Sequence, residues 1–171
     1  MSCGAKVHKI TQFPTNQSLK WRKMRKEEVK VPFVGEYNHT LDTKNRVFIP
    51  SKIREQLGEA FYITRKMDKE CLAIYPEAEM ALITEKLNQF PDSEVGDIKR
   101  FLYSKTICAS PDSNGRVVLP PQILSYAQIE KNVVIVGVGN HVQIWAEHLW
   151  KDEDSPSNIA TMRRKLASIG L

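Results

Sequence analysis

The sequence predicts an α+β protein, rich in β-strands, in which two related halves share one core. The first observation is a doubled motif, because the pattern Asp-x-x-x-Arg-Val-x-x-Pro of Asp42–Pro50 returns in Asp112–Pro120 at an offset of 70 residues. The second is that the strand-like segment 61–64 returns as 133–136. Two copies are fewer than a solenoid needs, so we expect one compact unit built from two halves.

The first half begins with an alternating segment, residues 36–41, which is typical of a half-buried strand. Tyr37, His39 and Leu41 share one face, and their equivalents in the second half are Ile107, Ala109 and Pro111. Because that face is apolar in the second copy, we interpret His39 as a core histidine and not as a ligand.

A tight turn follows in each half. Asn45 and Gly115 occupy the position that needs positive φ, and both residue types tolerate that conformation. Asp42 and Asp112 can accept hydrogen bonds from backbone N–H groups two or three residues later, which stiffens the turn. A return strand then ends at a proline that presets a short helix, which we expect over 51–57 in the first half.

Two further strands complete each half, and in the second half the turn Gly139-Asn140 joins them. Helical segments are expected after each half, over 77–90 and from residue 145 onward. The final segment, 158–171, places four apolar side chains on one stripe, so we expect an amphipathic helix that packs either within the chain or against another subunit. These side chains are Ile159, Met162, Leu166 and Ile169.

Composition and charge set limits on the function. The 171 residues are 42% hydrophobic and 26% charged, enough for one or two small domains, and no segment is apolar enough to cross a membrane. The three cysteines are odd in number and far apart, which indicates reduced thiols. No P-loop or zinc spacing is present, and a strand-like segment follows Gly137-Val138-Gly139, so we predict no catalytic residues, metal or cofactor.

The basic charge is concentrated at the N-terminus. The net charge is +5, but residues 1–30 alone hold eight Lys or Arg against two Glu. This segment either lies along DNA phosphates or an acidic partner, or it is a solvated extension that keeps the chain soluble. The candidate nonspecific DNA contacts are Lys20, Arg22, Lys23, Arg25 and Lys26.

The segment 35–58, the second motif and the segment 133–145 together resemble the MraZ family of bacterial transcriptional regulators. The resemblance covers about residues 33–150 and implies a duplicated AbrB-like, swapped-hairpin β-barrel, a pseudo-dimer within one chain, with peripheral helices. It implies a cytoplasmic, nucleoid-associated repressor of the division and cell-wall gene cluster. Such a repressor binds direct repeats of a short G-rich box as a closed homo-oligomeric ring, without a small-molecule substrate.

The expected organisation has four parts. Residues 1–32 form a basic extension that the family core lacks, 33–102 the first repeat with a helical insertion, 103–150 the second repeat, and 151–171 a helical tail. The two turns also differ, because Lys44 in the first corresponds to Asn114 in the second.

The predicted DNA contacts are Lys44, Arg46, Lys52, Arg54 and Arg116. An arginine presented by a rigid turn can pair with guanine O6 and N7, and the first turn, with more cations, should dominate phosphate attachment. The competing interpretation of Arg46 is an ion pair with Asp42 across the turn. A protein-interaction module that assembles into an oligomer without specific DNA readout is therefore the alternative function.

Overall fold

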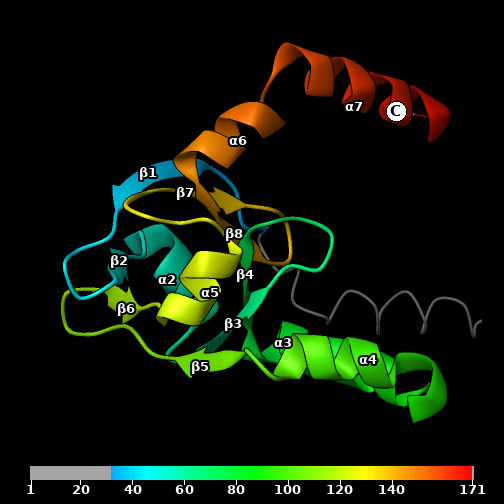
Figure 1. The fold of residues 1–171 in the computed structure, drawn as a ribbon, viewed down its shortest axis with the longest axis horizontal. Coiled ribbons are helices and arrows are strands. Elements are labelled where there is room, and N and C mark those ends of the chain that lie inside the picture. The colour runs from blue at the N-terminus through cyan, green and yellow to red at the C-terminus, as the bar shows by residue number, and fades with distance from the viewer. Residues whose placement is uncertain (1–31, 171) are drawn as a thin grey trace, which may run out of the picture. The chain divides into compact units, whose positions relative to one another are not determined.

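The computed structural model describes residues 32–170, and it has the α+β, strand-rich architecture that the sequence predicts (Figure 1). The basic segment from Lys20 to Lys26 lies outside the described residues. No helix among residues 32–170 is long and apolar enough to span a bilayer.

The two halves contain the same elements in the same order. The elements of the first half are β1 (Glu36–Thr40), β2 (Arg46–Phe48), α2 (Ser51–Leu57), β3 (Phe61–Arg65), β4 (Leu72–Pro76), α3 (Glu77–Asn88) and α4 (Asp92–Tyr103). Those of the second half are β5 (Ile107–Ala109), β6 (Arg116–Val118), α5 (Pro121–Tyr126), β7 (Asn132–Gly137), β8 (Val142–Ala146), α6 (Glu147–Glu153) and α7 (Pro156–Ser168).

The strands of the two halves interleave. The larger sheet has the order β1-β7-β8-β4-β3-β5, so each half lends its first strand to the other half. The registers match, since Tyr37 pairs with Ile135, and its equivalent Ile107 pairs with Ile63. This exchange confirms the swapped-hairpin arrangement.

A pseudo-two-fold axis relates the halves. In the smaller sheet, β2 pairs with β6 and Val47 lies opposite its own equivalent, Val117. In the larger sheet, β4 pairs with β8 and Ala73 lies opposite its equivalent, Gln143. A residue can face its own equivalent only on a symmetry axis, so both sheets are centred on it.

Helices α2 and α5 both pack on the larger sheet, α2 against β4 and α5 against β3 (Figure 1). Ile53 of α2 and Ile123 of α5 are buried in one core that also contains Val47 and Val117. Helix α2 ends at Leu57, where the sequence predicts its end, and Gly58 follows with a φ of 86°.

The insertion after the first half contains one helix more than the sequence predicts. Helix α3 begins at Glu77 as expected but ends at Asn88, and α4 follows it. The Arg65 guanidinium holds α4 against β3, because its carbon lies 4.3 Å from the centroid of the Phe101 ring and its Nη2 donates to the Phe101 carbonyl at 3.1 Å.

His39, predicted as a core histidine, is half-buried. Its ring centroid lies 5.3 Å from that of Phe48, and burial lowers the pKa of His39. His39 therefore lies against the exposed Phe48 ring at the edge of the core, so the prediction of a core histidine holds only in part.

The C-terminal amphipathic helix begins at Pro156, two residues before the predicted start. It has no buried residue, and Met162, Leu166 and Ile169 are exposed. Residues 32–170 therefore do not bury the apolar stripe of α7.

We expect Gly137→Ala to destabilise the fold. A Cβ at this position would lie 2.4 Å from the backbone nitrogen of Val34, and backbone cannot move aside as a flexible side chain does. The cost should be about 1–3 kcal/mol or more in urea unfolding. Gly96→Ala is the matched control, since its nearest neighbour would be 3.8 Å away and alanine favours a helix by about 1 kcal/mol. Equal stability of the two variants would contradict this account.

Candidate nucleic-acid interface

The first turn is held by one carboxylate. Oδ1 of Asp42 accepts hydrogen bonds from the backbone N–H groups of Lys44 at 2.8 Å and of Arg46 at 2.9 Å. Asn45 has a φ of 54°, and its N–H donates to the Asp42 carbonyl at 3.0 Å. The turn therefore has the predicted positive φ and the predicted aspartate bond from the N–H two residues later, while the bond from the Arg46 N–H lies four residues later, beyond the predicted spacing.

The second turn repeats this geometry. Oδ1 of Asp112 accepts from the N–H groups of Asn114 and Arg116, both at 2.9 Å. Gly115 has a φ of 74°. Each motif thus builds the same rigid turn, and each turn places its arginine at the start of a strand.

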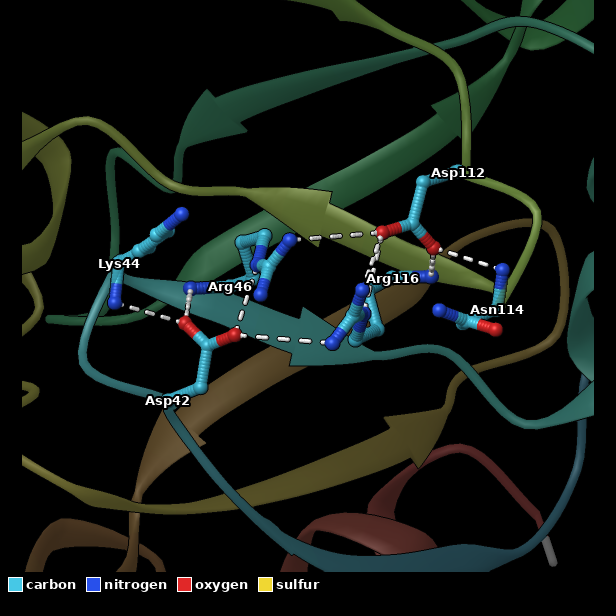
Figure 2. Close-up of polar contacts among 6 residues, drawn as sticks. All are labelled: Asp42, Lys44, Arg46, Asp112, Asn114 and Arg116. Atoms are coloured by element: carbon cyan, nitrogen blue, oxygen red, sulfur yellow. Dashed lines mark hydrogen bonds and ion pairs between the residues drawn. The ribbon is translucent and has the colours of Figure 1, made fainter.

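Each arginine pairs with the aspartate of its own turn, as Figure 2 shows. Arg46 Nε lies 2.7 Å from Asp42 Oδ2. In the second turn, both Nε and Nη2 of Arg116 lie 3.0 Å from Asp112 Oδ2. The ion pair that competes with DNA contact is therefore present in both turns.

The pairs also connect the two turns. Arg46 Nη1 lies 3.8 Å from Asp112 Oδ2, and Arg116 Nη1 lies 3.9 Å from Asp42 Oδ2 (Figure 2). We call these four residues the Asp–Arg cluster. Its side chains are between one quarter and about one third exposed, so solvent reaches them from one side.

The pairing of β2 with β6 explains this proximity. Val47 and Val117 point into the core, so the residues before and after them point outward. The outward side chains of this two-stranded ribbon are Arg46, Phe48, Arg116 and Val118, which we call the ribbon face. Val118 is 56% exposed and Phe48 is 38% exposed. Sequence reasoning missed these two side chains, although they alternate with the buried valines.

Both carboxylates are held in their charged form. The pKa of Asp42 is lowered to about 2, chiefly because the Arg46 N–H donates to it; desolvation opposes this shift, and the Arg46 side chain adds to it. The pKa of Asp112 is lowered for the same reasons, with the Arg116 N–H first. The cluster therefore keeps two anions beside two cations at neutral pH.

Arg54, a predicted DNA contact, makes a contact between the repeats. Its Nε donates to the Ile49 carbonyl at 2.9 Å, and its guanidinium carbon lies 5.6 Å from the centroid of the Phe48 ring. A Cβ on Gly115 would lie only 2.6 Å from that carbon, so Arg54 packs on the second turn. The equivalent residue in the second half is Leu124, so only one turn is clamped in this way.

Lys44 and Lys52 are exposed, and neither makes an ion pair with another residue in the range 32–170. Lys44 lies on the first turn, on the far side of Arg46 from Arg116 (Figure 2). Its counterpart Asn114 is also exposed but neutral. The structure thus brings together Arg46 and Arg116, with Lys44 at one turn and Lys52 on α2. Within these described residues, no group of three or more His, Cys, Asp and Glu could hold a metal ion.

We expect the Asp42 carboxyl to titrate with a pKa of about 2 in a carbon-detected NMR titration. In Arg46→Gln this pKa should rise only part of the way to its ordinary value of 3.8, since the backbone N–H remains. Because the folded pKa is the lower one, stability should fall as pH drops from about 4 toward 2. Arg100→Gln, which removes a pair with Asp97, is the control and should leave Asp42 unchanged. An Asp42 pKa near 3.8 in the unsubstituted chain would contradict the geometry.

Comparison with known proteins places this geometry in a family. The family model described as "MraZ protein, putative antitoxin-like" matches residues 33–97 and 102–164. "Transcriptional regulator MraZ" of Clostridium tetani is 37% identical over 142 residues, which cover 81% of this chain and 99% of that protein. The protein of the same name from Carboxydothermus hydrogenoformans is 42% identical over 122 residues, 70% of this chain and 85% of that protein. The resemblance carried by the doubled motif is confirmed: the chain belongs to the MraZ family.

Proposed function

We propose that this chain is a transcriptional regulator that binds double-stranded DNA through the ribbon face. The observation that carries the proposal is the pair of neighbouring arginines that begin the two strands of a ribbon with an exposed face. The major groove of B-DNA admits a ribbon of this kind. The names of the relatives, which are transcriptional regulators, support the same function.

Arg46 is the better candidate for reading a base. Its Nε is bound to Asp42, but Nη2 has no hydrogen bond or ion pair within residues 32–170. Arg116, in contrast, has both Nε and Nη2 on Asp112. A guanidinium whose inner edge is fixed by a carboxylate can present its outer nitrogens to guanine O6 and N7. This chemistry fits a G-rich box.

The phosphate contacts should be unequal between the turns. Lys44 and Lys52 are exposed cations of the first repeat, whereas the second turn has the neutral Asn114. Each neutralised phosphate adds close to one unit to the salt dependence of binding. We therefore propose that the first repeat supplies most of the backbone attachment, with Arg54 supporting the turns.

The same proposal extends to the oligomer. The exposed apolar stripe of α7 accompanies Arg163, Arg164 and Lys165, and α7 has no acidic residue. Helices α3 and α4 have acidic residues in their first turns and expose Leu82 and Ile98. We propose that α7 of one copy packs on α3 and α4 of the next. Such a head-to-tail contact closes into a ring when the rotation permits.

A ring makes a weak contact useful. One ribbon reads only a few base pairs, but linked copies on tandem boxes bind with a high effective concentration. We propose that the ring represses the division and cell-wall gene cluster in this way, in the cytoplasm and at the nucleoid. This extension rests on the family and on the exposed stripe of α7.

One observation favours the alternative, an oligomeric protein-interaction module. Each arginine of the Asp–Arg cluster already faces two carboxylates, so the cluster can be a purely structural device. The two functions differ in one measurement. A regulator prefers a particular duplex over a shuffled one, and an interaction module has no such preference.

We expect Arg46→Ala to lose about 5- to 150-fold of the preference for a target duplex, the range of one guanine contact. The target is the duplex that the full-length protein enriches from a randomised library, and affinities come from fluorescence anisotropy over a salt series. Arg116→Ala should lose less of this preference.

Lys44→Gln should weaken binding to the target and shuffled duplexes alike and reduce the salt slope by about 1. Lys151→Gln, at an exposed lysine of α6 outside the proposed contacts, is the charge-matched control. Failure to enrich any sequence would refute the regulator.

We expect Leu166→Glu to dissociate the assembly, because it places a charge in the apolar stripe of α7. Sedimentation velocity measures the change in mass. Ala160→Glu adds the same charge to an exposed position on the other side of α7 and should leave the oligomer intact. A mass unchanged by Leu166→Glu, or a monomeric unsubstituted chain, would rule out this interface.

A further inference from the structure

We infer that the Asp–Arg cluster joins the two turns into one reading unit, in which Asp112 of the second repeat is a positioning residue for Arg46 of the first. This inference rests on the proposed function. Under this inference, base discrimination by Arg46 of the first repeat depends on Asp112 of the second repeat, which does not itself contact the base.

The first support is the geometry of Asp112. Its Oδ1 is bound by two backbone N–H groups, so its carboxylate has one fixed orientation. Its Oδ2 then faces both guanidiniums, at 3.0 Å from Arg116 and at 3.8 Å from Arg46 Nη1. Arg46 thus has its inner nitrogen on Asp42 and one outer nitrogen beside Asp112, which limits the directions its remaining donor can take.

The second support is the backbone that connects the turns. The N–H of Ile49 donates to the Gly115 carbonyl at 2.9 Å, and the N–H of Leu119 donates to the Asn45 carbonyl at 2.8 Å. Arg54 packs on Gly115 as well. A displacement of the second turn therefore passes directly to the strand that begins with Arg46.

The third support is charge. Two carboxylates on a face that meets phosphates repel DNA, so they oppose nonspecific attachment. Besides holding the turns, the carboxylates can favour binding by orienting the arginines: a guanidinium held in its binding geometry loses less side-chain freedom when it meets a base. A cluster built for orientation should raise discrimination between sequences and not affinity for DNA in general.

The test is Asp112→Asn in the full-length protein. The amide oxygen can still accept the two backbone bonds, while the NH₂ that replaces Oδ2 cannot accept from arginine. Affinity for the enriched target duplex should fall at least about 5-fold, the lower end of one guanine contact. Affinity for a shuffled duplex should stay the same or rise, because one anion is lost. The control is Asp68→Asn, which removes an equal charge from the pair with Lys66 and should change the affinity for neither duplex.

A double-mutant cycle assigns the effect to Arg46. Asp112→Asn should still reduce discrimination when Arg116 is alanine, but it should cost little when Arg46 is alanine. The inference fails if Asp112→Asn keeps the wild-type ratio, if both duplexes lose affinity equally, or if the loss disappears only in the Arg116→Ala background. Circular dichroism of each variant establishes that the fold is retained before the affinities are compared. If the unsubstituted chain itself shows no preference, the proposed function fails, which is a separate result.

Discussion

The pairing of strands between the two halves is the interaction on which the rest of the structure depends. Each half gives its first strand to the other, so β1 lies on β7 and β5 lies on β3. The ribbon of β2 and β6 exists only because both halves are present, and it buries Val47 against Val117 at its centre. A single half would leave these edges unpaired, with unsatisfied backbone groups and an exposed core.

That pairing also determines the chemistry of the exposed face. Arg46 and Arg116 start equivalent strands on either side of the axis, so their side chains meet outside the core. Two like charges this close repel, and the two aspartates compensate for that repulsion. The same carboxylates stiffen the turns through backbone hydrogen bonds, so one residue type serves both the local turn and the contact between turns.

Much of the fold could be predicted because its signals are local or repeated. The turn at Asp42, the helix 51–57 and the doubled order of elements all follow from short patterns. The remainder depends on contacts between distant residues. Helix α4 is held by Arg65, 36 residues away from Phe101, and no local pattern marks that contact. For the same reason, the sequence predicts Arg54 as a DNA contact but does not indicate that it packs on Gly115.

The contact of Arg54 with Gly115 has a consequence for how the molecule meets a double helix. Two identical subunits related by a true two-fold axis read inverted repeats, because both faces present the same groups in opposite directions. In this chain, the second half has Leu124 where the first has Arg54, and Asn114 where the first has Lys44. The two ends of the pseudo-dimer are consequently not equivalent. Under the proposed function, such a protein would bind DNA in one direction, and successive copies would lie head to tail along it.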